Sequence, residues 1–380
     1  MTEPPDPHEP YEPDLPRTMK VKRRALRTGW TTGACAAAAA KAATAALAEQ
    51  RAQEIVEIAL PSGRRVAFPV DSCSYGPERA EAVVVKDAGD DPDVTDGARL
   101  TATVSWRAEP GVALDGGEGV GVVTKPGLGL ELGGPAINPV PSQMIRQAVG
   151  EVVADRGVRV VISVPGGELM ARKTTNRRLG ILGGISILGT TGVVRPFSTA
   201  SWLASVEQAV AVMAAQGETT LVLATGGRTE RGAMAMLPKL PEVCFVEVGD
   251  FTGAALRQAV ARDLRRVVFV GMIGKLTKLA AGVLMTHYTR SKVSTELLAE
   301  ITHDMGGDLE LVSAVRSANT ARHAYELWEA AGVLGTCGRE LCRRTAGVLE
   351  RFTDGRIAAQ VVLVDFTGKR MIAMYGRLGR

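Results

Sequence analysis

Strand and helix patterns alternate along the second half of the chain, and this alternation narrows the possible folds more than any other feature. Short runs rich in Val, Leu and Phe are each followed by a helical pattern, with glycine-rich connections between them. Parallel strands need a crossover, usually a helix, so the alternation predicts a parallel, doubly wound sheet. The expected strands are Thr220–Ala224, Val243–Val248 and Arg266–Val270, and the expected helices are Thr199–Gln216, Arg228–Leu237, Thr252–Asp263 and Lys275–Val283.

The first half has a different pattern. An alanine-rich run from Thr32 to about Gln50 predicts a helix that Thr32 caps, because Ala is the strongest helix former. The remaining strands follow one another as hairpins rather than in βαβ units, which indicates a mixed α+β domain. A hairpin is expected at Ile55–Leu60 and Arg65–Val70, further strands at Ala82–Lys86, Arg99–Arg107, Val120–Thr124 and Val158–Val164, and a helix at Pro141–Asp155.

The two ends of the chain complete the expected organisation. The first 18 residues hold six prolines and few apolar side chains, which is typical of disorder. Helices are expected at about 293–304 and 318–351, and a terminal hairpin at Ala358–Val364 and Arg370–Met374. We therefore expect an α/β protein with a disordered acidic tail (1–18), an N-terminal α+β domain (19–196), a C-terminal Rossmann-like three-layer α/β/α domain (197–355) and a C-terminal β-hairpin (356–380).

Composition limits the class of ligand. The chain of 380 residues is 46% hydrophobic and 23% charged, which excludes a mostly disordered protein, and its aromatic share of 4% excludes base stacking as a main activity. Residues 1–16 carry five acidic and no basic side chains, while the net charge of the whole chain is +4. The remainder is thus moderately basic, which suits an anionic small molecule better than nucleic acid.

Cysteine spacing and hydropathy point to a cytoplasmic protein. The five cysteines include no C-x-x-C pair, so we expect neither a disulfide framework nor a zinc site, and no metal ligands in the protein itself. No apolar run reaches about 18 residues, and the N-terminus does not have the pattern of a signal peptide. We expect no membrane span, and the sequence leaves the oligomeric state open, a homo-oligomer included.

Three strand ends in the second half are the first candidate site. In a doubly wound sheet, ligands bind beyond the carboxyl ends of the strands, where glycines admit a ligand and helix N-termini present N–H groups. Asp250 lies 24 residues beyond Gly226, near the spacing of about 20 at which an acid holds a ribose hydroxyl. The spacing around Gly274-Lys275 does not fit a P-loop. The alternative is that these are only tight βα turns. The connections concerned are Thr225–Glu230, Gly249–Gly253 and Gly271–Lys278.

Glycine-rich loops framed by basic residues are the second candidate site. Lys125 opens one loop, and Arg178 and Arg195 bracket Gly180–Gly192. Guanidinium groups pair well with carboxylates, so this framing favours a polycarboxylate ligand, although connecting loops with surface charge would look the same. His287 follows the last glycine-rich turn and is a candidate acid or base, whereas a lone histidine is more often structural.

Several stretches together resemble one family. The segment Leu26-Arg-Thr-Gly-Trp-Thr-Thr-Gly-Ala-Cys35 and the alanine run after it are similar to the N-terminal signature of the CbiD family, the cobalt-precorrin-5B C(1)-methyltransferases of anaerobic cobalamin biosynthesis. The resemblance spans roughly residues 20–375, with Trp30 and Ala34 as departures. The other stretches that carry it are Gly121–Gly127, Gly133–Pro139, Arg178–Pro196, Thr225–Arg228, Gly249–Phe251 and Gly271–Gly282.

The resemblance implies an enzyme that transfers a methyl group from S-adenosylmethionine to carbon 1 of cobalt-precorrin-5B, giving cobalt-precorrin-6A. Cobalt then enters as part of the substrate. A non-catalytic tetrapyrrole carrier and a nucleotide-dependent transferase or kinase remain alternatives. Combined with the two candidate sites above, this gives a hypothesis for the site residues. We expect the donor to be bound by Thr225, Gly226, Gly227, Arg228, Asp250, Gly271 and Gly274, the acceptor by Thr31, Thr32, Lys125, Arg178, Arg195, Lys275 and Lys278, and His287 to be the catalytic residue.

Overall fold

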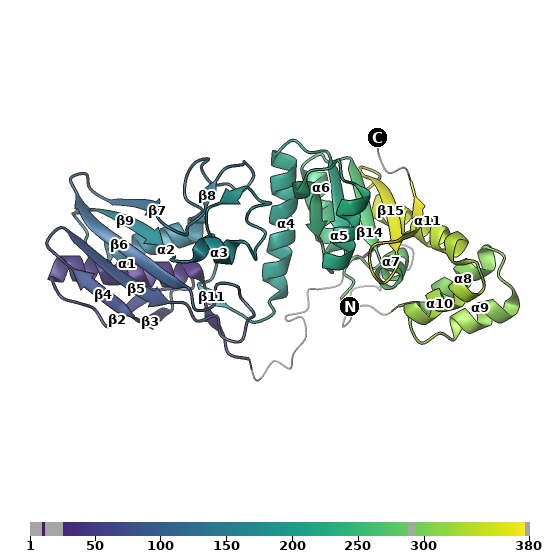
Figure 1. Ribbon diagram of the computed structural model, residues 1–380, viewed down its shortest axis with the longest axis horizontal. Coiled ribbons are helices and arrows are strands. Elements are labelled where there is room, and N and C mark those ends of the chain that lie inside the picture. The colour runs from purple at the N-terminus through teal and green to yellow at the C-terminus, as the bar shows by residue number, and fades with distance from the viewer. Residues whose placement is uncertain (1–9, 12–25, 288–292, 377–380) are drawn as a thin grey trace, which may run out of the picture. The chain divides into compact units, whose positions relative to one another are not determined.

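The structure is a computed structural model that describes residues 10–11, 26–287 and 293–376 (Figure 1). It divides into a first unit, Thr18–Ser198, and a second unit, Thr199–Arg380 together with Met1–Arg17. Both units combine helices with sheets, and parallel and antiparallel pairings both occur, so the chain is a mixed α/β protein as expected. Apart from residues 10 and 11, the tail predicted to be disordered lies outside the described residues.

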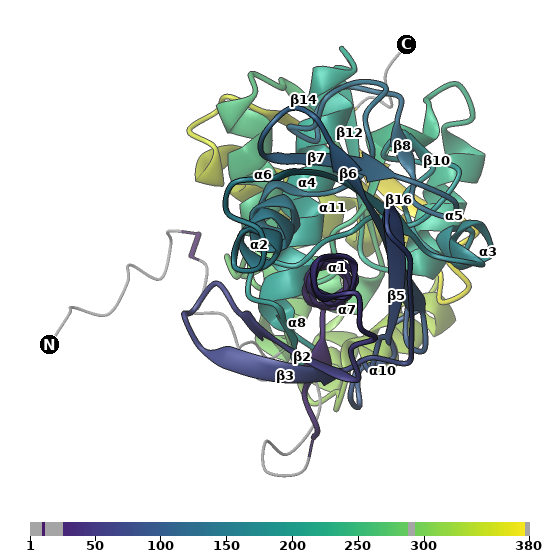
Figure 2. The same cartoon turned by 90° about the vertical axis from the view of Figure 1, so that its left-hand side faces the viewer.

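The first unit is built around α1 (Thr32–Glu49). Between Thr32 and Leu47 every residue is buried except Lys41, so the helix is enclosed on nearly all sides. Alanine makes this possible, because its small side chain lets neighbouring elements approach the helix axis closely while favouring the helix itself. Figure 2 looks along α1 and shows α2 (Pro139–Gly150), β5 (Arg79–Val85), β6 (Arg99–Arg107) and the β2–β3 hairpin around it.

A five-stranded sheet forms one wall of this unit. Strand β7 pairs in parallel with β9, and α2 lies in the connection between them. The expectation of hairpins rather than βαβ units is therefore wrong for this pair, because β7 lies in a glycine-rich segment whose pairing comes from tertiary contact with β9. The sheet order is β4 (Ser72–Tyr75), β5, β6, β9 (Gly157–Ser163) and β7 (Val112–Gly116), and the predicted hairpin forms a separate sheet of β2 (Ile55–Ala59) and β3 (Arg65–Pro69).

The glycine-rich loops of the first unit pack against each other. A Cβ atom on Gly184 would lie 2.1 Å from the carbonyl oxygen of Gly119, and one on Gly119 would lie 1.9 Å from that of Val164. Backbone contacts this close admit only glycine. Short elements pin the loops together, namely β8 (Val122–Val123) with β10 (Ile181–Leu182), β1 (Gly29–Trp30) with β11 (Val193–Val194), and α3 (Gly167–Ala171).

The second unit contains a five-stranded sheet whose first four strands are parallel. The chain enters at β12, moves to one side for β13, and then crosses to the other side for β14. The terminal hairpin lies in this same sheet, where β16 is the antiparallel edge strand. The order is β13 (Phe245–Glu247), β12 (Thr220–Ala224), β14 (Arg266–Gly271), β15 (Ala358–Val364) and β16 (Met371–Tyr375).

The central strands are buried on both faces. Leu221 to Ala224 are all fully buried although successive residues point to opposite faces, so helices must cover both sides. Among the described residues no helix is long and apolar enough to cross a membrane. The helices are α4 (Thr199–Ala215), α5 (Gly227–Met236), α6 (Thr252–Ala261), α7 (Ile273–Ala280), α8 (Thr295–Asp304), α9 (Leu309–Arg316), α10 (Ala321–Ala330) and α11 (Leu334–Phe352).

The expected single helix over 318–351 is wrong. The structure has two helices there, α10 and α11, separated at Gly332, whose φ of +71° favours glycine. The N–H groups of Gly332 and Val333 donate to carbonyls of the preceding turn, which is the usual glycine-based helix end. Helix α9, which precedes this region, was not expected from the sequence.

Candidate functional site

The carboxyl edge of the parallel sheet brings two predicted turns together. The strand order reverses between β12 and β14, and at such a point the following connections diverge and leave room for a ligand. The Thr225 N–H donates to the Val270 carbonyl at 3.3 Å, and a Cβ on Gly271 would lie 3.3 Å from the Thr225 methyl carbon. The turns after β12 and β14 are therefore in contact where the sheet predicts a site.

The turn after β12 is held in shape by Thr229. Its hydroxyl accepts from the Gly226 N–H at 3.0 Å and donates to the Gly226 carbonyl at 2.7 Å. Helix α5 begins at Gly227, so its first N–H groups have no partner within the helix. The exposed Arg228 guanidinium donates to the Phe366 carbonyl at 3.1 Å, which places that side chain on the β15–β16 turn.

Three glycines at this edge are not required by the packing of the protein. Gly226 has a φ of 168°, which any residue adopts, and a Cβ there would meet no atom closer than a Glu247 oxygen at 4.0 Å. A Cβ on Gly227 would meet nothing closer than the Arg231 guanidinium at 3.6 Å, and one on Gly274 nothing closer than Ala321 at 3.9 Å. These are ordinary contact distances. The missing side chains leave a cradle along the turn after β12 and the start of α7, open to a ligand that approaches the backbone.

A cluster of hydrogen-bonded residues shares α7 with this cradle and consists of Asp250, Lys275, Lys278 and Thr286. The Lys275 ammonium donates to Asp250 Oδ1 at 2.6 Å and to the Gly249 carbonyl at 2.7 Å. The Thr286 hydroxyl donates to the same Asp250 oxygen at 2.9 Å. Lys278 donates to the Thr286 carbonyl at 2.9 Å. These bonds hold together the β13–α6 turn, helix α7 and the segment after α7, which are separate in the sequence.

The cluster has one carboxylate and two ammonium groups. Burial acts to raise the pKa of Asp250, but the charge and hydrogen bond of Lys275 and the bond from Thr286 outweigh it, so this pKa is lowered and the group is ionised. Burial lowers the pKa of Lys278, against the attraction of Asp250. His287 is only 4% exposed and its charge, when protonated, also favours ionised Asp250.

A buried hydroxyl near the cluster belongs to Thr252. Thr252 begins α6, two residues after Asp250, and is fully buried. Its hydroxyl oxygen has no hydrogen-bond partner within the part of the chain that the structure describes. Buried hydroxyls are normally bonded, so Thr252 is an exception in the turn that carries Asp250.

The predicted acceptor-binding residues of the first unit include buried threonines and exposed basic residues. Thr31, and not Thr32 as expected, caps α1, because its hydroxyl accepts from the Ala34 N–H at 3.1 Å. The Thr32 hydroxyl accepts from the Leu188 N–H at 2.9 Å and ties the helix to the glycine-rich loop. Both threonines are buried. Lys125 and Arg195 are exposed, and Arg178 is half-buried.

An exposed apolar pair lies on β10 and on β8, which ends close in sequence to Lys125. Val122 and Leu182 face each other across the β8–β10 pairing, and they are 43% and 47% exposed. Directly opposed side chains on paired strands point to the same face. The first unit therefore offers an apolar surface, with a basic side chain nearby in the chain.

Sequence reasoning missed Glu247. This last residue of β13 lies in register with Ala224, and its carboxylate oxygens lie nearest to the positions that side chains on Gly226 and Gly227 would take, apart from the Arg231 guanidinium. A signal was present, because Glu247 lies 21 residues beyond Gly226, closer than Asp250 to the spacing of about 20 that holds ribose.

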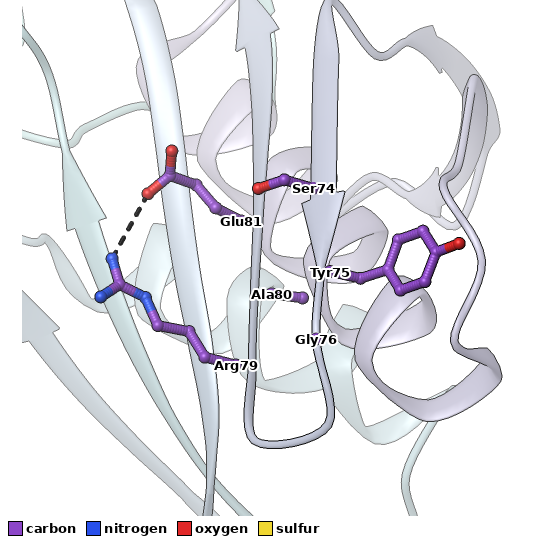
Figure 3. Close-up of a pocket in the computed structure, with 6 residues that line it drawn as sticks. All are labelled: Ser74, Tyr75, Gly76, Arg79, Ala80 and Glu81. Carbon is purple, nitrogen blue, oxygen red and sulfur yellow. Dashed lines mark ion pairs between the residues drawn. The ribbon is translucent and has the colours of Figure 1, made fainter.

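A separate shallow pocket lies on the β4–β5 hairpin of the first unit. Figure 3 shows Arg79 and Glu81 pointing toward each other, joined by an ion pair of 3.6 Å, while Tyr75 points away. An exposed pair of this kind contributes little free energy. None of the predicted site residues lines this pocket.

Fold and site together define an α/β protein with glycine turns that leave space at the carboxyl edge of a largely parallel sheet. Residues 19–196 match the CbiD family, and residues 285–373 match the CbiD C-terminal domain. A protein of Salinispora arenicola named cobalt-precorrin-5B C(1)-methyltransferase is 69% identical over 327 residues, 86% of each chain. The chain belongs to the CbiD family.

A second relative and a solved structure are also similar to this chain. A protein of Rubrobacter xylanophilus with the same name is 65% identical over 320 residues, 83% of this chain and 82% of its own. A solved structure described as a cobalamin biosynthesis protein (cbiD) from Archaeoglobus fulgidus is 28% identical, has a TM-score of 0.37 and covers 73% of this chain and 93% of that chain.

Proposed function

We propose that this protein is a C-methyltransferase that uses S-adenosylmethionine to methylate carbon 1 of cobalt-precorrin-5B, giving cobalt-precorrin-6A. The observation that carries the reaction is the 69% identity, over 86% of both chains, to a protein named for it. The glycine cradle at the carboxyl edge of the sheet supports the presence of a donor site. The cobalt belongs to the acceptor, which is the substrate.

In this proposal the second unit is a Rossmann-like domain that holds the donor. The turn of Thr225, Gly226, Gly227 and Arg228 and the turn containing Gly271 and Gly274 line the donor site. When bound, the donor supplies an electrophilic methyl group on a sulfonium, which an electron-rich macrocycle carbon displaces in line. The part of the protein is to orient the ligands and to exclude water, which accounts for glycine turns rather than a nucleophilic side chain.

The acceptor is proposed to bind the first unit. A corrinoid precursor has a broad apolar face and carboxylates at its rim. The exposed Val122 and Leu182 pair suits the face, and Lys125, Arg178 and Arg195 suit the carboxylates. Because Thr31 and Thr32 use their hydroxyls within the protein, we propose that they shape the loop rather than contact the acceptor.

His287 is proposed as the group that receives a proton at the reaction centre. Its burial beside Thr286, which is bonded to Asp250, places it in a water-poor environment next to a carboxylate. Lys275 and Lys278, which the sequence suggests as acceptor ligands, instead donate hydrogen bonds within the protein. Lys275 donates to the Asp250 carboxylate and the Gly249 carbonyl, and Lys278 donates to the Thr286 carbonyl. We propose that they hold the wall of the donor site.

Incubation with methyl-labelled S-adenosylmethionine and purified cobalt-precorrin-5B tests the proposal. We expect label in the corrinoid product and stoichiometric S-adenosylhomocysteine. A tetrapyrrole carrier would bind the corrinoid without transferring label, and a kinase would require ATP and Mg²⁺. Either result would contradict the proposed reaction.

A further inference from the structure

The carboxylate of Glu247 faces the glycine cradle. In strands, side chains lean along the strand direction, and Glu247 ends β13 one strand away from the turn after β12. Positions for a Cβ on Gly226 and on Gly227 lie 4.0 Å from Oε1 and 3.7 Å from Oε2 respectively. Both carboxylate oxygens therefore border the space that the two glycines leave open.

Asp250 is placed differently. Its Oδ1 atom accepts hydrogen bonds from both Lys275 and Thr286, and its backbone carbonyl accepts from the Thr286 N–H at 3.2 Å. These bonds connect the β13–α6 turn to α7 and to the segment ending at His287. The position of Asp250 is that of a group that fixes the wall of the site.

We propose that Glu247 accepts the hydrogen bonds of the two ribose hydroxyls of the donor, and that Asp250 acts as a positioning residue. The inference rests on the proposed function, since it assigns a ligand contact within the proposed donor site. A vicinal diol donates two hydrogen bonds, which match the two oxygens of one carboxylate. The placement of Glu247 at the end of the strand adjoining the glycine turn, 21 residues beyond Gly226, agrees with this role.

Calorimetric titration with S-adenosylhomocysteine and with its 2′,3′-dideoxy analogue tests the assignment. The wild-type protein should bind the analogue roughly tenfold to a hundredfold more weakly, the range for hydrogen bonds to a charged group. E247Q keeps one acceptor oxygen but loses the charge and the second acceptor, so it should bind S-adenosylhomocysteine more weakly than the wild type and should distinguish the two ligands by a smaller factor. E242Q is the matched control, because Glu242 is exposed and lies before the same strand; it should bind both ligands as the wild type does.

The outcomes separate this inference from the proposed function. If the wild type does not bind S-adenosylhomocysteine, the donor site and the inference both fail. If the wild type binds both ligands equally, or if E247Q discriminates between them as strongly as the wild type does, only the assignment of Glu247 fails. E247D keeps the charge but shortens the side chain by one methylene, so it should distinguish the two ligands less strongly than the wild type does. If circular dichroism shows that E247Q is unfolded, E247D is used in its place.

Discussion

At the scale of single residues, the glycines of this chain have two different physical explanations. Gly119 and Gly184 lie where backbone carbonyls approach within about 2 Å of a would-be Cβ, so the fold itself requires them. Gly226 and Gly227 meet only the ends of flexible side chains at 3.6 to 4.0 Å. Packing of the loops explains the first pair but not the second, and we propose that the second pair leaves room for a ligand to approach the backbone.

This difference predicts opposite effects of the same substitution. G227A should leave the free energy of unfolding unchanged or raise it by about 0.5–1 kcal/mol, because alanine favours the first turn of α5. It should nevertheless weaken S-adenosylhomocysteine binding by about tenfold or more, since a methyl group would enter the cradle. G184A is the control and should unfold at lower denaturant. Unaltered ligand affinity in G227A would contradict the cradle.

Asp250 provides a second prediction at this scale. D250A removes the acceptor of Lys275 and Thr286, so the wall of the proposed donor site loses two hydrogen bonds while the buried strands are untouched. We expect donor affinity to fall by about tenfold, equally for S-adenosylhomocysteine and for its dideoxy analogue. Titration calorimetry measures both, and circular dichroism checks the fold. An unchanged affinity would exclude Asp250 from the site.

At the scale of elements, the alanine helix α1 is held by charge at Lys41, the one position between Thr32 and Leu47 that is not buried. Lys41 pairs with Glu151, at the end of α2, and also donates to the Glu57 carbonyl of β2 at 2.8 Å. Arg65 of β3 pairs with the same carboxylate at 2.9 Å. Hydrogen bonds from Arg65 and Lys41 lower the pKa of Glu151 from 4.5 to about 2.

The lowered pKa of Glu151 predicts a pH-dependent stability. Because the folded state favours the ionised carboxyl, this stabilisation is complete above pH 4.5 and is lost as the pH falls toward 2. E151Q should therefore reduce the free energy of unfolding by about 1 kcal/mol at pH 7. The difference from wild type should shrink in urea titrations below pH 4.5. E49Q, in an exposed pair with Arg51, should change stability little at any pH. A gap that persists unchanged at pH 3 would contradict this.

The sequence predicted most elements because their signals are local. The bounds Arg99–Arg107 and Thr220–Ala224 agree between prediction and structure, since both strands are runs rich in β-forming residues between turn residues. Strand β7 was missed because its pairing partner, β9, lies beyond α2. The break at Gly332 was missed because an apolar helical periodicity continues through it.

At the scale of the whole molecule, the division into two units predicts that the donor changes amide hydrogen exchange in the second unit only. If the donor binds at the carboxyl edge, S-adenosylhomocysteine should slow amide hydrogen exchange in peptides covering 225–231, 247–253 and 271–278. Peptides from α1 should exchange at the same rate with and without it. Mass spectrometry resolves the two sets, and protection of α1 alone would place the donor in the first unit instead.

The sequence by itself was enough to predict the alanine helix, the alternation of strands and helices, the glycine turns and the family resemblance, because each of these depends on residues close together in the chain. The role of each glycine and acid was a matter of tertiary structure. Spacing alone selected Asp250, whereas the folded chain bonds Asp250 to Lys275 and Thr286 and brings Glu247 to the glycine turn. The strand order decides the roles of these two acids, because it places the ends of β12, β13 and β14 at one edge of the sheet. The sequence alone does not show which strands are neighbours.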